Sequence, residues 1–240
     1  MARGLRRIAV AAFTLALAGS AAVEAETLVY QATTSGQQAL DQDDKGGNPF
    51  ASALIDTLAQ AGTGLPDLSQ SLRRLTLHYS KGRQTPQVPD ATATPVWQVA
   101  PAKPGEQRIA LVLVISDYGQ VGVQSLPGAK FDAERIGAAL TRAGFTTEIA
   151  LDLDRDGVTR KLAAFAEASR SKDTAVIYTT GHGVEVGGTV YLIPGDYPIA
   201  ERNRALAGRA IALPRIAEAA QARTVNLVFY GGCRDNPLAE

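Results

Sequence analysis

Short runs of apolar residues alternate with amphipathic segments from residue 108 onward. The run at 109–115 (IALVLVI) is continuously apolar, as expected for a strand that is covered on both faces. Between the runs, apolar residues recur at helical spacing, and one such segment begins at Pro127 and ends before Gly144. This alternation predicts an α/β fold with a mostly parallel sheet and helices on both of its faces. The predicted strands are residues 109–115, 146–151, 174–179 and 225–230, with a short hairpin segment at 189–193.

The part of the chain before residue 108 contains too few elements to form a domain of its own. Residues 28–32 predict a strand, and Asn48 followed by Pro49 predicts the start of a helix. A second helix carries the apolar stripe of Leu68, Leu72 and Leu75. One strand and two helices cannot bury their own apolar faces, so we expect them to dock on the later sheet. Residues 82–105 contain five prolines and predict an extended connection, with an edge strand at 96–99 that brings the sheet to about six strands.

The first 25 residues have the layout of a secretory signal peptide. A basic start with Arg3, Arg6 and Arg7 precedes an apolar run at 8–18, and the segment ends on Val23-Glu24-Ala25. The apolar run is too short for a permanent membrane helix, so we expect an exported protein, periplasmic or secreted, without a membrane anchor after cleavage. The Arg6-Arg7 pair leaves twin-arginine export open as an alternative route. The remaining residues, 26–240, are predicted to form a single domain.

Charge and cysteine content narrow the chemistry. The 240 residues include 24 Lys+Arg and 24 Asp+Glu, a balance that predicts no nucleic-acid partner. The single cysteine, Cys233, cannot form an internal disulfide, and a free thiol in an oxidising compartment is a liability unless it is buried or used. A buried apolar cysteine is the alternative reading.

Cys233 and one of the two histidines follow predicted strands. His182 comes directly after the strand at 174–179 and Cys233 after the strand at 225–230. In parallel sheets, ligands bind beyond the carboxyl ends of the strands, so neighbouring strands would bring the two side chains together. A thiol nucleophile beside an imidazole base is the minimum for cysteine hydrolase chemistry. His78 lies on an amphipathic helix, and we expect it on the surface.

Three segments resemble the caspase, metacaspase and bacterial caspase-like peptidases. They are residues 109–117 followed by 126–133 (LPGAKFDA), residues 178–183 (YTTGHG) with 191–196 (YLIPGD), and residues 232–237 (GCRDNP). The resemblance implies a three-layer caspase-like fold and a peptide or protein substrate. It also implies that Cys233 is the nucleophile, that His182 is the general base, and that the N–H groups of Gly183 and Cys233 form the oxyanion hole.

The order of the segments departs from that family. Relatives continue after the nucleophile strand with further strands and helices, whereas residues 28–36, Asp41, 48–54 and 82–86 resemble those C-terminal segments but precede the rest here. We therefore expect a circular permutation, in which 26–100 corresponds to the family's C-terminal part, 101–107 is a linker, and 108–240 carries His182 and Cys233. A truncated gene with an unrelated N-terminal segment is the alternative.

The resemblance also supplies candidate substrate-binding residues. Asp132 matches an acidic pocket position of metacaspases, and Thr180 matches a small hydroxyl residue beside it. Gly231 stands where relatives have Asp or Gln, and Leu126 stands where caspases have the arginine that binds aspartate. The remaining acidic position favours cleavage after a basic residue. A helix N-terminal charge is the alternative role for Asp132.

No cofactor is predicted, although Asp152, Asp154, Asp156 and Gly157 spell the start of a calcium loop. The twelfth position of that loop is Ala163 instead of glutamate, which argues against an EF-hand and leaves calcium as an open alternative to a capped strand-to-helix loop. The function that the sequence favours is an exported cysteine endopeptidase. A non-catalytic binding or scaffold protein, and another Cys–His hydrolase or transferase, are the alternatives.

Overall fold

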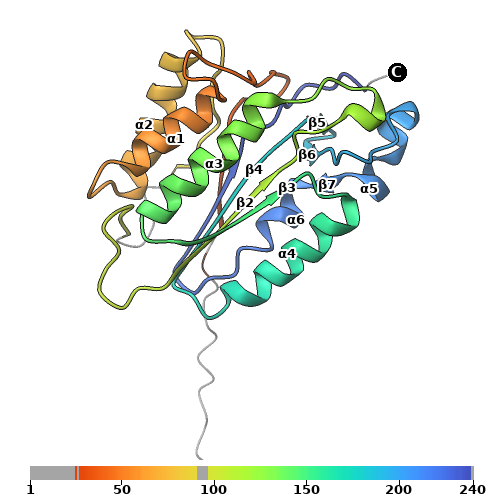
Figure 1. The fold of residues 1–240 in the computed structure, drawn as a ribbon. Coiled ribbons are helices and arrows are strands. Elements are labelled where there is room, and N and C mark those ends of the chain that lie inside the picture. Colours follow the sequence, from red (N-terminus) through yellow and green to blue (C-terminus); the bar gives the residue numbers. More distant parts are fainter. Residues whose placement is uncertain (1–24, 26, 91–96, 239–240) are drawn as a thin grey trace, which may run out of the picture.

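The computed structural model describes residue 25, residues 27–90 and residues 97–238 (Figure 1). Residues 1–24, which contain almost all of the predicted signal peptide, lie outside the described residues, as does Val96 of the predicted edge strand. The core of the molecule is a parallel five-stranded sheet with the strand order β1-β8-β4-β2-β3. Its strands are β1 (Thr27–Gln31), β2 (Arg108–Val114), β3 (Thr146–Leu151), β4 (Thr174–Thr180) and β8 (Val225–Tyr230).

Helices cover both faces of this sheet, as predicted (Figure 1). The helices α1 (Pro49–Leu58), α2 (Leu65–Tyr79) and α3 (Pro127–Arg142) pack on one face, and α4 (Arg155–Ser169) and α6 (Leu213–Ala217) pack on the other. Short helical segments η1 (Gly119–Val121), η2 (Ile199–Ala205) and α5 (Leu206–Arg209) lie in the connections. The start of α1 is as expected from the sequence, because Asn48 Oδ1 accepts a hydrogen bond from Phe50 N–H at 2.7 Å ahead of Pro49.

The N-terminal segment docks on the later sheet through β1. Each residue of β1 pairs in parallel with β8, from Thr27 opposite Asn226 to Gln31 opposite Tyr230. The ring of Tyr30 stacks on that of Phe229, with 4.9 Å between the centroids. The strand that leads to Cys233 is therefore internal to the sheet, and a buried strand of this kind is held in place on both sides.

The sixth strand that the sequence predicts is not formed by residues 97–99. Gln98 makes only an isolated bridge with Gly64, and Val99 N–H donates to Thr63 O at 2.8 Å. Residues 97–99 therefore pair with the segment that precedes α2 and do not extend the main sheet. Their contact with the sheet is made by a side chain, because Trp97 Nε1 donates a hydrogen bond to Thr174 Oγ1 at the start of β4. A separate antiparallel sheet is present instead, with the order β5 (Gly183–Val186), β6 (Thr189–Leu192) and β7 (Ile211–Ala212). Its strand β6 lies within the segment predicted at 189–193, whereas β5 was not predicted.

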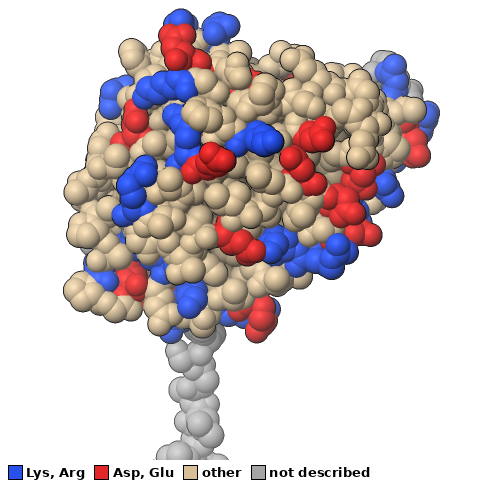
Figure 2. Space-filling view, viewed as in Figure 1, with Lys and Arg blue, Asp and Glu red and all other residues tan. Residues whose placement is uncertain are grey.

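Charges of both signs are interspersed on the face shown in Figure 2, and the described residues of that face carry no large patch of one sign. Within the described part of the chain, none of the helices combines the length and the hydropathy that crossing a bilayer requires.

Candidate active site

The structure places His182 and Cys233 at the same edge of the sheet. β4 and β8 are neighbours, with Thr179 paired to Tyr230, and Gly231 N–H extends the pairing by donating to Thr179 O at 2.8 Å. His182 and Cys233 each follow this pair by three residues, beyond the carboxyl ends of their strands. The adjacency that the sequence analysis required is therefore present.

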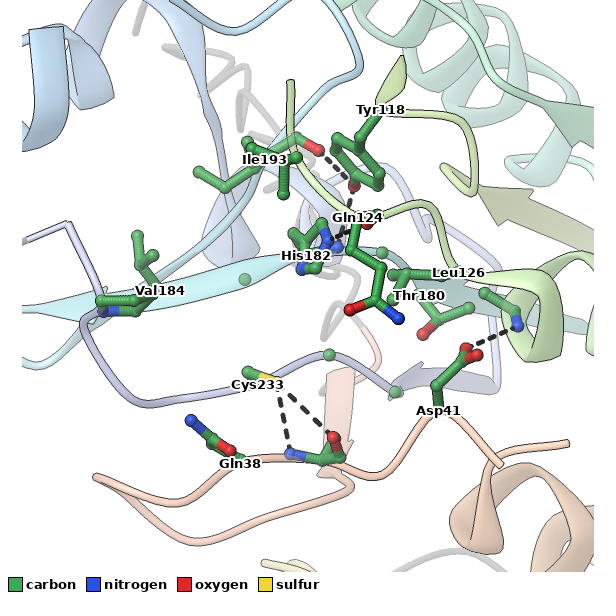
Figure 3. A pocket seen from close by; sticks show the side chains of 18 of the residues that line it. Gln38, Asp41, Tyr118, Gln124, Leu126, Thr180, His182, Val184, Ile193 and Cys233 are labelled. Atoms are coloured by element: carbon green, nitrogen blue, oxygen red, sulfur yellow. Dashed lines mark hydrogen bonds between the residues drawn. The ribbon is translucent and has the colours of Figure 1, made fainter. Parts of the chain in front are cut away.

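Both residues line a cavity of about 540 Å³ above the sheet (Figure 3). Three connections form its walls: the segment after β1, the segment between β2 and α3, and the ends of β4 and β8. Its surface is mostly apolar, with a few polar groups that face inward, which is the usual character of a binding site for an organic molecule or peptide. The lining includes Gln38, Ala39, Leu40, Asp41, Asn48, Tyr118, Val123, Gln124, Leu126, Ala129, Thr180, His182, Val184, Ile193, Gly231 and Cys233.

The imidazole of His182 is fixed by a backbone carbonyl. Its Nε2 lies 2.7 Å from Gln124 O. A carbonyl oxygen can only accept, so Nε2 carries a proton, and in the neutral imidazole Nδ1 is then the nitrogen that can accept one. The ring of Tyr118 packs against the imidazole in a T-shaped arrangement, with 4.5 Å between the centroids. His182 is thereby prepared to accept a proton at Nδ1.

The thiol of Cys233 is held by the segment that follows β1. Ala39 N–H donates to Sγ at 3.3 Å, and Sγ lies 3.7 Å from Ala39 O (Figure 3). Burial raises the pKa of the Cys233 thiol, an effect that the Ala39 N–H opposes. The thiol is therefore protonated at neutral pH. No hydrogen bond joins it to His182, although both side chains belong to the described residues and face the same cavity.

The backbone around the thiol is packed too closely for side chains. A Cβ atom added at Gly183 would lie 1.7 Å from the Tyr230 hydroxyl and 2.6 Å from Cys233 O. The Tyr230 hydroxyl in turn donates to Cys233 O at 3.3 Å, so this hydroxyl contacts the backbone of Cys233 and packs closely against Gly183. The N–H of Cys233 has no acceptor among the described residues. A free amide beside the thiol is what an oxyanion hole requires.

Two of the three predicted substrate-binding residues line the cavity, and the third does not. Thr180 and Gly231 lie in its wall, and a Cβ at Gly231 would come within 2.8 Å of Thr180 Oγ1. Asp132 is 0% exposed, accepts a hydrogen bond from Asn48 N–H at 2.7 Å and pairs with Arg135 at 3.0 Å. Burial raises the pKa of Asp132 to about 7. In contrast to our expectation, Asp132 thus lies behind the wall of the cavity, because the start of α1 covers it.

Asp235 and Asp41 both line the cavity, and neither was predicted as a site residue. The one that contacts α3 is Asp41. It is half-buried, and its two oxygens accept hydrogen bonds from Gly128 N–H and Ala129 N–H, each at 3.0 Å. These are amides of the first turn of α3, whose own N-cap residue, Leu126, has no capping side chain. Two sequence signals were available for Asp41: the missing cap of this helix, and its place among the residues that resemble the family's C-terminal segments.

The aspartates of the calcium-like sequence have local partners. Asp152 accepts hydrogen bonds from Ser116 N–H at 2.6 Å and Asp117 N–H at 2.9 Å. Asp154 caps α4 through Gly157 N–H at 2.6 Å, and Asp156 pairs with Arg155. Across the described residues there is no group of three or more His, Cys, Asp or Glu side chains that could hold a metal ion. Asp152 and Asp154 therefore stabilise the local conformation of the loops that they contact.

Comparison with known families agrees with this architecture. The family model described as the caspase domain matches residues 107–238, more than half of the chain and all of the segment that carries His182 and Cys233. No curated protein matches the chain. A parallel sheet between two helical layers, with histidine and cysteine at the ends of adjacent strands, defines a caspase-like peptidase domain. The chain belongs to the caspase domain family.

Proposed function

We propose that this protein is an exported cysteine endopeptidase in which Cys233 is the nucleophile and His182 is the general base and acid. The observation that carries the proposal is that Cys233 and a tautomerically fixed His182 face one cavity from adjacent strand ends. Membership of the caspase domain family supports peptide hydrolysis as the reaction. Export follows from the N-terminal sequence pattern.

The reaction begins from a neutral thiol, because burial raises the pKa of Cys233. Sγ turns from Ala39 toward the substrate carbonyl carbon while Nδ1 of His182 removes its proton, and the C–S bond forms. The N–H groups of Gly183 and Cys233 stabilise the negative carbonyl oxygen. The imidazolium, whose Nε2–H is bound to Gln124 O, then gives the proton to the leaving amine nitrogen as the C–N bond breaks. Water, deprotonated by His182, hydrolyses the thioester and restores the thiol.

Cleavage profiling on a peptide library tests the proposal. The wild-type chain is expected to cut internal peptide bonds with a preference at one side of the scissile bond, and the Cys233→Ala variant, prepared in parallel, is expected to cut none. If both samples cut the same peptides, the cutting comes from a contaminant and not from Cys233, and the proposal is contradicted.

The substrate residue before the scissile bond is proposed to be basic, with Asp41 as the group that selects it. Asp41 shares the lining with apolar and neutral residues such as Leu126, Ala129 and Thr180, and with one other carboxylate, Asp235, which accepts a hydrogen bond from Gln38 Nε2 at 2.7 Å. The N-terminus of α3 offsets only about half of a unit charge, so a net negative charge remains for a lysine or arginine side chain. This proposal replaces Asp132 with Asp41 as the acidic pocket residue.

Asp41→Asn is expected to lower kcat/KM roughly 10- to 100-fold for peptides with Lys or Arg before the scissile bond, since a charge-assisted contact contributes about 1.5–3 kcal/mol. Peptides that differ only in having Gln at this position should lose much less. Asp44→Asn is the matched control, because Asp44 pairs with Lys81 at the surface, where its side chain is 80% exposed. Equal losses for basic and neutral peptides would contradict the assignment of Asp41.

A non-catalytic peptide-binding protein is the second candidate. It is favoured by the contact of Cys233 Sγ with Ala39 in place of His182. Binding of library peptides to both wild-type and Cys233→Ala protein, with no cleavage by either, is the result that would select this function.

We also infer that the chain is a circular permutation of the family's order. The support is that β1 pairs in parallel beside β8, so a segment from the start of the chain continues the sheet next to the nucleophile strand. A chain that runs from 107 to 238, then through a linker to 27–100, is expected to fold to the same sheet. The linker must span the length of β1, whose five residues extend about 17 Å at ~3.3 Å per residue, so a linker of about ten residues is long enough. If the reconnected chain fails to unfold cooperatively while the native-order chain does so, the inference is contradicted.

A further inference from the structure

The β5–β6 hairpin is held open at the end that carries His182. Gly183 pairs with Leu192, and the same antiparallel register places His182 opposite Ile193. Ile193 N–H donates to His182 O at 2.9 Å, which is one of the two bonds that such a pair exchanges. The second bond, from His182 N–H to Ile193 O, is replaced by a bridge through a side chain.

The bridging group is the hydroxyl of Tyr118. It accepts a hydrogen bond from His182 N–H at 2.8 Å and donates one to Ile193 O at 2.7 Å (Figure 3). Tyr118 is 0% exposed, and burial raises the pKa of its hydroxyl well above the ordinary range, so the hydroxyl keeps at neutral pH the proton that it donates. The hydroxyl thus acts as a wedge: it lies between His182 N–H and Ile193 O and keeps these two backbone groups from bonding directly.

The wedge and the imidazole are coupled through the same residue. The ring of Tyr118 contacts the imidazole, so one side chain positions both the backbone and the ring of His182. Gly181, directly before His182, leaves room for this arrangement, because a Cβ there would lie 2.8 Å from the Tyr118 hydroxyl.

Tyr118 and the imidazole's carbonyl partner lie on one short segment between β2 and α3. Tyr118 N–H donates to Ser125 Oγ at 3.1 Å, and Val123 N–H donates to Tyr118 O at 3.4 Å, so the segment that carries Gln124 closes on Tyr118 itself. A shift of Tyr118 therefore changes the distance between His182 and Gln124 O, on which the tautomer depends.

We propose that Tyr118 is a positioning residue for His182: its hydroxyl, wedged between His182 N–H and Ile193 O, keeps the imidazole on Gln124 O with Nδ1 directed into the cavity toward Cys233. The proposal rests on the proposed function for its kinetic consequence, but its structural consequence is independent of activity. Without the hydroxyl, the hairpin can close by direct pairing of His182 with Ile193, and the imidazole moves away from Gln124 O.

Nitrogen-15 NMR of the histidine side chains tests this directly in the Tyr118→Phe variant of the full chain. The chain has two histidines, so His78, on the surface of α2, is an internal reference in each spectrum. We expect a single Nε2–H tautomer for His182 in the wild type and a mixture of the two tautomers in the variant, with kcat at least tenfold lower and KM within twofold. Tyr30→Phe, which removes a buried hydroxyl far from the cavity, is expected to change neither readout.

Rescue separates positioning from general damage to the fold. Placing 4-aminophenylalanine at position 118 keeps a donor for Ile193 O and an acceptor for His182 N–H, and it is expected to restore the tautomer and most of kcat. If Tyr118→Phe fails to fold, the rescued chain is compared with one that carries 4-methylphenylalanine, which fills the same space without the bonds. A wild-type tautomer in a folded chain that lacks the bridging group would overturn the proposal. A shifted tautomer in a protein whose wild type cleaves no peptide would support the positioning role while the proposed function fails.

Discussion

Replacing Cys233 by alanine is expected to lower kcat/KM for peptide hydrolysis by roughly 10⁴-fold or more, the scale on which removal of a catalytic nucleophile acts. Cys233 is the sole cysteine of the chain, so no neighbouring thiol can substitute for it. The change removes one half-buried sulfur atom and should leave the thermal unfolding midpoint within a few degrees of the wild type. Steady-state hydrolysis of a peptide taken from the library profile, together with thermal unfolding, measures both effects.

His182→Ala is expected to cause a loss of similar size, because the raised pKa of Cys233 leaves the thiol dependent on a base. His78→Ala is the matched control and should retain wild-type activity, since His78 lies on the exposed face of α2. Activity of His182→Ala within tenfold of the wild type would mean that the thiol ionises without an imidazole, and the dyad would be refuted.

Gly183→Ala is a further substitution with a large expected effect. The added Cβ would overlap the Tyr230 hydroxyl, at 1.7 Å, so the backbone that carries one oxyanion donor must move. We expect a loss of about 1–3 kcal/mol in the free energy of unfolding, as for other overpacked sites. We expect kcat to fall by about 100-fold, because a displacement of about 1 Å at reacting groups has that cost. Chemical denaturation and steady-state kinetics measure the two effects.

A double mutant identifies the cause. In Gly183→Ala with Tyr230→Phe, the 1.7 Å overlap is removed and the closest ring atom would lie 3.1 Å from the new Cβ, while Cys233 O still lies at 2.6 Å, so only part of the stability and activity should return. Gly208→Ala is the control for a glycine-to-alanine change, since a Cβ at Gly208 would meet no atom within 4 Å. If the losses of stability and activity in the double mutant equal the sum of the losses in the two single mutants, the two positions are independent, and the close packing assigned to this pair is wrong.

The three inner strands, β2, β4 and β8, could be predicted because their apolar runs are buried on both faces. The edge strands are less buried, but residues 146–151 were predicted with the bounds that β3 has, and the strand at 28–32 was expected to dock on the later sheet, where β1 pairs with β8. His182 and Cys233 could be selected for a related reason. Rare, reactive side chains directly after two predicted parallel strands must meet if those strands are adjacent.

The remaining site residues depend on contacts that a sequence pattern does not encode. Gln124 acts through its backbone carbonyl, so its side-chain identity carries no signal. Tyr118 and Asp41 act on His182 and on α3, which lie far from them along the chain. Asp132 was expected in the pocket because it matches an acidic pocket position of metacaspases, but here the start of α1 covers its carboxylate, which accepts a hydrogen bond from Asn48 N–H. The predicted strand at 96–99 failed because residues 97–99 pair with the segment before α2 and not with the sheet.

Covalent labelling of the intact chain tests the central claim most directly. The probe is a peptidyl acyloxymethyl ketone with lysine next to the reactive group, which requires both an activated thiol and a peptide-binding cavity, and the adduct is located by mass spectrometry. We predict one adduct on Cys233 in the wild type and in the His78→Ala variant. We predict no adduct in the His182→Ala variant. Equal labelling of His182→Ala, or no labelling of folded wild-type protein by this probe and by its Arg, Asp and Leu counterparts, would contradict the central claim.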